Sequence, residues 1–148
     1  MGKVLLTIVL LLGGCVSQKP VPKVNLELRE VGESLRVNYK IMVTKDEKSS
    51  FPVSNKVLMT GESIEKASFA KNDSGTYDVT VFLNKSGAEK FHALTKSLIG
   101  KKLAVILDGE LLTAPEIMEA ISGGTFQISG AFTKDEADKI ARGLTPQK

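Results

Sequence analysis

Few residues in this sequence could carry out chemistry. The 148-residue chain has one cysteine, Cys15, and one histidine, His92. Nucleophilic catalysis needs an activated serine or cysteine beside a base, and a metal site needs several convergent ligands. The acidic residues that lie closest together in the central region are Asp108, Glu110, Glu116 and Glu119. Turn, helix-cap and solvent-facing positions account for these carboxylates, so we expect no enzyme activity, no metal and no cofactor.

Cys15 directly follows an apolar run with a positively charged start. Lys3 precedes the run from Val4 to Leu12, which has the layout of a secretory signal and is short for a bilayer span. The sequence Leu12-Gly13-Gly14-Cys15 resembles the lipobox of bacterial lipoproteins, in which the cysteine is lipidated, with palmitate among the chains, and becomes the mature N-terminus. We therefore expect residues 1–14 to be a lipoprotein signal peptide. The alternative is an ordinary signal peptide or a short membrane anchor, with Cys15 incidental.

The expected lipid anchor would hold the protein on the extracytoplasmic face of a membrane. Val16 stands where lipoproteins retained at the inner membrane commonly have an aspartate, so both the cell membrane and an outer membrane stay open as destinations. Residues 15–23 contain two prolines and no helix or strand periodicity, which predicts a flexible tether after the lipidated cysteine. Residues 24–148 are then the folded domain.

The composition is that of one globular domain. Hydrophobic residues make up 42% and charged residues 25% of the chain, enough for a core of its own. The formal net charge is +3, and loss of residues 1–14 would reduce the 20 basic side chains to 19, against 17 acidic ones. Because the basic residues are scattered and nearly balanced, we expect no nucleic-acid binding.

The first half of the domain is predicted to be mainly β-structure. Alternating apolar residues predict strands at 24–28 and 35–43, joined as a hairpin at Gly32-Glu33, and a second hairpin of residues 67–71 and 76–83 around a turn at 72–75. Residues 44–56 are predicted to be a polar loop, followed by a short strand at 57–60 and a helical turn at 62–66. Within the loop, Phe51 is interpreted either as an anchor on the core or as an aromatic contact for a bound peptide.

Three helices are predicted from Ser or Thr followed three residues later by Glu, the pattern of a capping box. The first ends with Gly100 as its cap. The second is short, has Pro115 in its first turn and is stopped by Gly123-Gly124. The third carries an apolar face through Leu144. The three pairs are Ser86 with Glu89, Thr113 with Glu116, and Thr133 with Glu136.

The stretch from Leu103 to Thr133 contains the densest local signals. Leu103 to Leu107 predicts a buried strand, Asp108-Gly109 a tight turn, and residues 110–113 the hairpin partner. Residues 125–129 form another predicted strand, broken by Gly130. The expected fold class is α+β, a mostly antiparallel sheet with two longer helices and one short helix packed on it.

These motifs, in this order, resemble the head portion of the large periplasmic domain of the SecD family, subunits of the bacterial Sec protein-export machinery. The resemblance covers nearly all of residues 24–144, and it implies the SecD head fold. In that family several transmembrane helices accompany the head; none is predicted here after the N-terminal apolar run. The matching motif residues are Gly100, Asp108, Gly109, Pro115, Gly123, Gly124, Ser129, Gly130 and Thr133.

The resemblance implies a role in protein translocation. In the family the head is thought to capture emerging polypeptide, so the implied partners are unfolded or emerging chains and Sec translocon subunits. An exposed strand edge or an apolar groove would be sufficient chemistry for such binding. The alternative is an envelope lipoprotein that uses the fold as an interaction module unrelated to Sec, since fold alone does not fix function.

Overall fold

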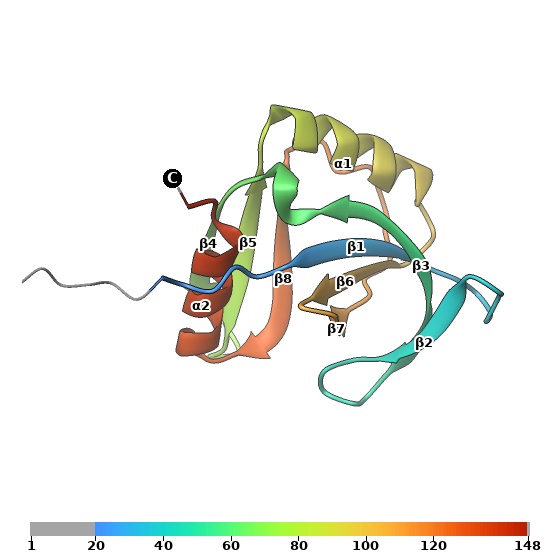
Figure 1. The fold of residues 1–148 in the computed structure, drawn as a ribbon, viewed down its shortest axis with the longest axis horizontal. Helices are drawn as coiled ribbons and strands as arrows, with labels where there is room; N and C mark the ends of the chain where they lie inside the picture. The colour runs from blue at the N-terminus through green and yellow to red at the C-terminus, as the bar shows by residue number, and fades with distance from the viewer. Residues whose placement is uncertain (1–19, 148) are drawn as a thin grey trace, which may run out of the picture.

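The computed structural model describes residues 20–147, so the expected signal peptide and Cys15 lie outside the described part of the chain. Strands form two antiparallel sheets, and two α-helices pack on them, which confirms the predicted α+β class (Figure 1). Within residues 20–147, neither helix is long and apolar enough to cross a bilayer. The elements are β1 (Leu26–Val31), β2 (Tyr39–Val43), β3 (Ser50–Thr60), η1 (Gly61–Ser63, a 3-10 helix), β4 (Ile64–Lys71), β5 (Tyr77–Leu83), α1 (Lys85–Ser97), β6 (Leu103–Leu107), β7 (Glu110–Thr113), β8 (Thr125–Phe132) and α2 (Lys134–Leu144).

The larger sheet has the strand order β2-β3-β1-β6-β7. The predicted hairpin between residues 24–28 and 35–43 is therefore wrong. The two edges of β1 are occupied by β3 and β6, and β2 pairs instead with β3. Residues 35–38 also do not form a strand, and Leu35 and Val37 are 62% and 98% exposed.

Strand β3 occupies much of the region predicted to be a loop. Pro52 lacks an N–H group and would normally disfavour an inner strand. Here the pairing of β1 with β3 shifts register next to Val31, and the Pro52 carbonyl accepts a hydrogen bond from the Gly32 N–H at 2.8 Å. Residues 57–60 continue β3. In place of the helical turn predicted at 62–66, the structure has the 3-10 helix η1, which ends at Ser63. The turn is shorter than predicted because Ile64 already begins β4 with a buried side chain.

The smaller sheet has the order β4-β5-β8 and contains the predicted hairpin at 67–83. The prediction that Gly130 ends the last strand is wrong, because β8 continues to Phe132. The strand is irregular at this point: the pairing shifts register between Ser129 and Phe132, and Ala131 has a φ of 50°. Gly130 has no room for a Cβ atom, which would lie 2.5 Å from the Phe132 ring.

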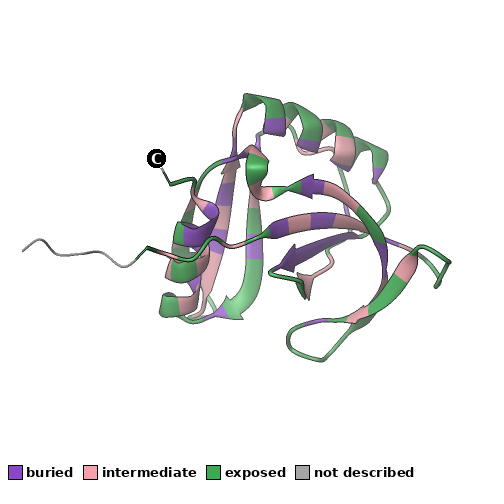
Figure 2. Ribbon diagram, in the orientation of Figure 1, coloured by how far each residue is buried: buried purple, intermediate pink, exposed green. Residues whose placement is uncertain are grey.

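Strand β6 is the centre of the packing, and all five of its residues are buried (Figure 2). Successive side chains of a strand point to opposite faces. Leu103, Val105 and Leu107 belong to the main core, which lies between the two sheets and the helices, whereas Ala104 and Ile106 belong to a second, smaller cluster with Val31, Val53 and Leu111. The predicted β6–β7 hairpin with its turn at Asp108-Gly109 is confirmed.

The larger sheet curls so that its two outer strands meet at one end. Thr44, just after β2, forms a parallel bridge with Leu111 of β7, and the Lys45 N–H donates to the Leu111 carbonyl at 2.8 Å. The second core cluster lies against these strands, with Met42 and Phe51 packed on it. Phe51 is therefore a half-buried residue of β3, not a residue of a solvated loop.

Helix α1 was predicted correctly, but its caps were not. Asn84 is the N-cap, and its side chain accepts a 2.8 Å hydrogen bond from the Gly87 N–H, in place of the predicted Ser86–Glu89 pair. The C-cap is Leu98. Gly100 lies two residues further on with a φ of 79°, and its N–H donates to the Ile117 carbonyl.

The short helix predicted after Thr113 does not form. Thr113 is the last residue of β7, and residues 114–122 run in an extended, irregular path beside the chain that follows α1. Their backbone groups bond across to that chain: the Pro115 carbonyl accepts from the Leu103 N–H, and the Ile117 N–H donates to the Lys101 carbonyl. The Ile121 N–H donates to Thr95 Oγ1 on α1. These long-range bonds replace the local ones of a helix.

Helix α2 begins with the predicted capping box. The Glu136 N–H donates to Thr133 Oγ1 at 3.3 Å, and the Thr133 N–H donates to Glu136 Oε2 at 2.9 Å. Its buried face packs on β4 and β5 and includes Ala137, Ala141 and Leu144. At its end, the Gly143 carbonyl accepts a hydrogen bond from the Val24 N–H at 3.0 Å, which ties the first described residues to the helix.

Candidate functional site

The motif residues singled out in the sequence are distributed over the fold and form no single site. Asp108 and Gly109 have φ angles of 49° and 84° and turn the β6–β7 hairpin. Asp108 also bonds to Asn25, where the Asn25 N–H donates to Asp108 Oδ1 at 2.9 Å. Thr133 caps α2, and Ser129 and Gly130 lie at the irregular part of β8. Each of these residues has a backbone role.

The paired glycines differ from each other. Gly124 has a φ of 62°, and a Cβ atom there would lie 2.8 Å from the Ala88 Cβ on α1. Its carbonyl accepts from the Leu83 N–H at 2.8 Å. Gly123 has no atoms within 4 Å of its ideal Cβ position. The second glycine thus allows β8 to begin in close contact with α1.

The titratable residues show no arrangement for catalysis in the described part of the chain. Between residues 20 and 147 there is no group of three or more His, Cys, Asp or Glu side chains placed to hold a metal ion. His92 lies half-buried on α1, and its Nδ1 atom is buried without a hydrogen-bond partner among these residues. Within the described residues, His92 Nδ1 thus lacks the hydrogen-bonded acid or nucleophile that general-base catalysis requires.

Two carboxyl groups have lowered pKa values, and both are explained by local structure. The Thr44 hydroxyl donates to Asp46 at 2.7 Å, and this bond, then one from the Lys48 N–H, lowers the pKa of Asp46 in the β2–β3 turn. The backbone N–H and then the hydroxyl of Thr133 lower the pKa of Glu136 in the α2 capping box. In both carboxyl groups these bonds favour the ionised form.

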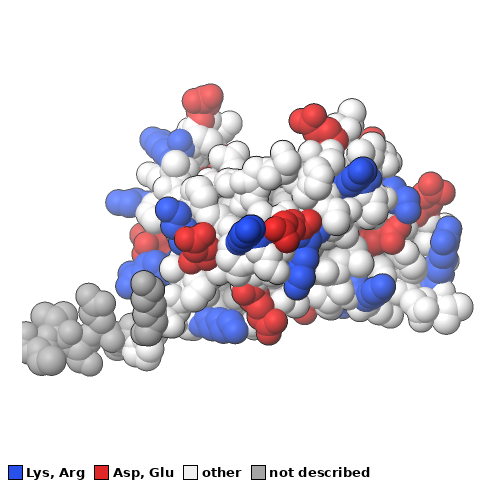
Figure 3. Space-filling view, turned by 90° about the horizontal axis from the view of Figure 1, so that it is seen from above, with Lys and Arg blue, Asp and Glu red and all other residues white. Residues whose placement is uncertain are grey.

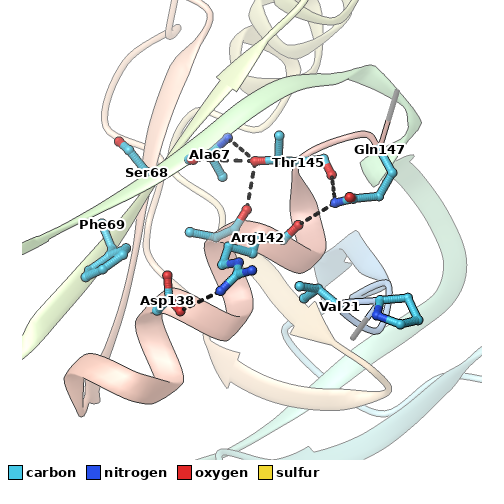
Figure 4. A pocket seen from close by; sticks show the side chains of 10 residues that line it. Val21, Ala67, Ser68, Phe69, Asp138, Arg142, Thr145 and Gln147 are labelled. Carbon is cyan, nitrogen blue, oxygen red and sulfur yellow. Dashed lines mark hydrogen bonds and ion pairs between the residues drawn. The ribbon is translucent and has the colours of Figure 1, made fainter. Parts of the chain in front are cut away.

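One surface hollow of about 440 Å³ lies between β4, α2 and the first described residues (Figure 4). Thr145 closes part of it, since its Oγ1 accepts from the Ala67 N–H at 3.0 Å. Arg142 points along α2 to Asp138, with a 3.5 Å ion pair, and Gln147 Nε2 donates to the Arg142 carbonyl. The polar groups drawn in this hollow are thus largely bonded to one another.

A second hollow of about 340 Å³ is mainly apolar and lies between α1, β6 and the extended segment 114–122. Phe91 and Phe126 form its inner wall, with ring centroids 5.0 Å apart. Met118, which is 77% exposed, lies at its rim. This hollow was not predicted, because the sequence pattern assigned its outer wall to a short helix.

A third, open hollow of about 500 Å³ lies between β2 and the β6–β7 turn. Ile41 and Val43 on β2 are 54% and 52% exposed, although both are large apolar side chains. Phe51 lies on the adjacent strand, where it is paired in register with Met42. The structure therefore places the predicted peptide-contact residue on the strand next to two exposed apolar side chains, and its contact with a peptide stays a prediction.

Charges do not define a binding surface. On the face shown in Figure 3, Lys and Arg side chains alternate with Asp and Glu side chains without a patch of one sign. Most ion pairs within residues 20–147 are exposed, such as Lys101 with Glu30 at 3.1 Å and Lys48 with Asp46 at 3.7 Å. Such pairs contribute little to stability or to ligand selection.

Fold and surface together define a class of α+β module with two antiparallel sheets and apolar surface hollows. The sequence profile described as SecDF, P1 head subdomain, matches residues 38–145, most of the chain. The protein therefore belongs to the SecDF P1 head family, as the sequence motifs indicated.

Individual relatives and solved structures agree with this assignment. Over 84 residues, which are 57% of this chain, it is 38% identical to the protein translocase subunit SecD of Acidaminococcus fermentans and 39% identical to the subunit SecDF of Thermus thermophilus. The matched stretch spans 20% and 11% of those two proteins.

Two solved SecDF structures share the fold. One, described as a membrane component that enhances protein export, has a TM-score of 0.68 at 27% identity and covers 84% of this chain and 63% of that chain. The other, SecDF in a super-membrane-facing form, has a TM-score of 0.70 at 28% identity and covers 84% of this chain and 19% of that one.

Proposed function

We propose that this protein is a membrane-anchored extracytoplasmic lipoprotein whose head domain binds polypeptide, without catalysis, during or after protein export. The observation that carries the proposal is the membership of residues 38–145 in the SecDF P1 head family. Protein export is the activity with which solved relatives of this fold are described. Unfolded polypeptide and Sec translocon subunits are the proposed partners.

The surface of the domain suits such a ligand. Unfolded chains offer apolar side chains and unpaired backbone groups, which bind to apolar hollows and free strand edges. The hollow behind Met118 and the exposed apolar side chains of Ile41 and Val43 beside the third hollow supply contacts of the first kind. Neither feature demands a particular sequence in the ligand, so weak and tolerant binding is expected.

The lipid anchor is a separate part of the proposal. It rests on the lipobox-like sequence Leu12-Gly13-Gly14-Cys15. Mass spectrometry of the protein from bacterial membranes should show an acylated N-terminal Cys15, and the variant Cys15→Ser should keep its signal peptide and incorporate no labelled palmitate. Labelling of the Cys15→Ser variant would show that this residue is not the attachment site.

Site-specific photo-crosslinking in cells tests polypeptide binding. A benzoylphenylalanine residue should replace Phe51, which keeps an aromatic ring there, or Gly123, where a side chain has free space. Exposed Lys90 on α1 is the control position. Crosslinks from Phe51 or Gly123 to secreted chains or Sec subunits, with fewer from Lys90, are the expected result.

The same experiment distinguishes the two functions considered. If neither position captured secreted chains or Sec subunits, polypeptide binding in export should be abandoned. Reproducible capture of one other envelope protein would instead support an interaction module unrelated to Sec. Affinity purification of the intact lipoprotein from membranes should identify the same partner.

A further inference from the structure

The chain directly after β7 forms an uncovered edge of the larger sheet. Pro115 and Ile117 bond to the chain at the start of β6. Glu116, between them, faces Lys102 in an antiparallel bridge. In an antiparallel pair, residues that bond to the partner strand alternate with residues whose N–H and C=O groups point away from it. The backbone groups of Glu116, and by the same alternation those of Ala114, therefore point away from β6.

These four outward groups are unbonded in the described part of the chain. Neither the N–H nor the C=O group of Ala114 or Glu116 has a hydrogen-bond partner within residues 20–147. Strand β2 covers the edge of β7 at Leu111, where Thr44 forms the parallel bridge and the Lys45 N–H donates to the carbonyl. The uncovered edge begins after the end of β7 and offers two donors and two acceptors at alternate residues.

The apolar hollow of about 340 Å³ behind Met118 lies directly beside this edge, and Glu116 is among the residues that line it. Phe91 and Phe126 form its inner wall. The flexible thioether side chain of Met118 at the rim can adapt to different apolar side chains. A chain that bonds to Glu116 therefore runs past an apolar pocket for its side chains.

The edge of β4 also has outward backbone groups, but its surroundings differ. The Ala67 N–H is bonded by Thr145 Oγ1, which shows that Ala67 points away from β5. By alternation, Phe69 and Lys71 also point outward. The hollow beside this edge contains polar groups that are largely bonded to one another. The β4 edge is thus an internal control for the edge after β7.

The charged residues that line the hollow behind Met118 are acidic. Glu116 and Glu119 belong to its lining, which contains no Lys or Arg. Neither glutamate forms an ion pair within residues 20–147. Because Lys102 lies opposite Glu116 in the bridge and offsets part of its charge, Glu119 contributes more to the attraction of a cation. A segment with Lys or Arg near its apolar side chains is favoured over an acidic one.

We propose that an extended polypeptide segment binds as an additional strand on the edge formed by residues 114–116 and inserts an apolar side chain into the hollow behind Met118. The segment would bond to the N–H and C=O groups of Ala114 and Glu116. A Lys or Arg near its apolar side chain would be attracted to Glu119. This inference rests on the proposed function and specifies the surface, the conformation and the charge preference of the ligand.

A second copy of this chain is the main competing occupant. The loop before β2 carries Leu35 and Val37, which are 62% and 98% exposed, with Arg36 between them. This loop has the apolar and basic side chains that the hollow favours. It is closed as a turn by a bond from the Tyr39 N–H to the Arg36 carbonyl, so it cannot offer an extended backbone to the edge. An extended polypeptide is the better occupant.

Fluorescence anisotropy of defined peptides with the purified full chain tests the inference. The first probe is an unstructured, fluorescein-labelled peptide in which leucines at alternate positions are flanked by lysines, and the second has glutamates in place of the lysines. The lysine peptide should bind about tenfold more tightly. Two further versions of it carry N-methyl groups on alternate backbone amides, in the two possible registers. Strand addition uses every second amide, so only one of the two should lose affinity, and equal affinity of both would overturn the inference.

Variants of the protein locate the binding. Glu116→Pro removes one outward N–H and leaves the inward bonds of its neighbours in place, and Met118→Ser removes the apolar rim. Each should weaken binding of the lysine peptide about tenfold or more. Glu119→Gln should remove most of the preference for lysine over glutamate, and an unchanged preference would overturn the charge assignment. Lys71→Pro on the β4 edge is the matched control and should change affinity less than about twofold.

Hydrogen exchange measured by NMR provides a readout that does not depend on the variants. Saturating the wild-type protein with the unlabelled lysine peptide should slow exchange of the Ala114 and Glu116 amides and leave the outward Phe69 amide of β4 unchanged. Unchanged exchange at Ala114 and Glu116 in the saturated complex would overturn the inference, as would full binding by folded Glu116→Pro and Met118→Ser proteins.

The failures of the two proposals are distinguishable. If wild type binds the lysine peptide but the variants and the exchange data exclude residues 114–116, polypeptide binding stands and this edge is excluded. If wild type binds neither the peptide nor a reduced and carboxymethylated unfolded protein, both proposals are overturned. If sedimentation shows concentration-dependent dimers that Val37→Ser and Met118→Ser both abolish, the hollow belongs to a second copy of this chain and the inference is wrong.

Discussion

Asn25 and Asp108, 83 residues apart, hold each other through two reciprocal hydrogen bonds. The Asn25 N–H donates to Asp108 Oδ1 at 2.9 Å, and the Asp108 N–H donates to the Asn25 carbonyl at the same distance. A turn residue of the β6–β7 hairpin thereby fixes the start of β1. The role is structural and long-range, in a position where the sequence alone indicated only a local turn.

Asp108 should tolerate replacement by Asn better than by Ala. Asn keeps a side-chain oxygen and accepts the positive φ of this position, whereas Ala loses the bond to Asn25 and is strained there. In chemical denaturation, Asp108→Ala should lower the free energy of unfolding by about 1–3 kcal/mol. Asp108→Asn should cost less than about 1 kcal/mol. Equal losses would show that the carboxylate charge, not the acceptor, matters.

The glycine pair provides a matched test of close packing. Gly124→Ala introduces strain at a φ of 62° and a clash with the Ala88 Cβ, so it should destabilise the domain by about 1–3 kcal/mol. Gly123→Ala adds the same methyl group in open space and should change stability by less than about 0.5 kcal/mol. Thermal unfolding of the two variants measures the difference. A loss in Gly123→Ala equal to that in Gly124→Ala would contradict this packing.

The capping box of α2 should make stability depend on pH in one direction. Bonds from Thr133 lower the pKa of Glu136 below its ordinary value of about 4.5, so the ionised carboxylate is stabilised in the folded state. This contribution is fully present above the unfolded pKa and is lost as the pH falls through the lower, folded value.

Denaturation of wild type and Glu136→Ala at several pH values tests this. The variant should be less stable at pH 7, and the gap should close only as the pH falls below 4.5. Thr133→Ala should cost about 1 kcal/mol at pH 7. A gap that does not change between pH 7 and pH 3 would show that the carboxylate charge contributes nothing.

Thr95 should be needed to hold the extended segment 114–122 on α1. Its buried hydroxyl donates to the Phe91 carbonyl at 2.8 Å and accepts from the Ile121 N–H at 2.9 Å. Thr95→Val preserves the shape but leaves the Ile121 N–H without its acceptor, at a cost of about 1–3 kcal/mol. Ser97→Ala removes an exposed hydroxyl bonded to Leu94 and is the control. Faster exchange of the Ile121 amide in Thr95→Val would locate the effect.

The parts of the fold that sequence predicted well are those fixed by neighbouring residues. The hairpins at 67–83 and 103–113 have strong turn residues between alternating or apolar runs, and α2 has both halves of its capping box. In each case the hydrogen bonds that decide the element lie within a few residues. Turn chemistry and cap chemistry are readable at that range.

The errors occurred where distant segments compete with local signals. Gly32-Glu33 suits a turn, yet β3 takes the edge of β1 that the predicted hairpin needed. Thr113, Pro115 and Glu116 look like a helix start, but bonds from Leu103 and to Lys101 hold the chain extended. The hollow behind Met118 was missed for the same reason, because its outer wall is the segment that these long-range bonds hold extended.

The hydrogen bond between the Val24 N–H and the Gly143 carbonyl also determines where a membrane tether would leave the domain. Pro20 lies five positions after Cys15, a contour of at most about 18 Å. With Cys15 lipidated as proposed, this short tether would keep the part of the domain that contains the C-terminal end of α2 close to the lipid headgroups. The β2 hairpin, at the opposite end in Figure 1, would then face the aqueous space from which an exported chain can approach.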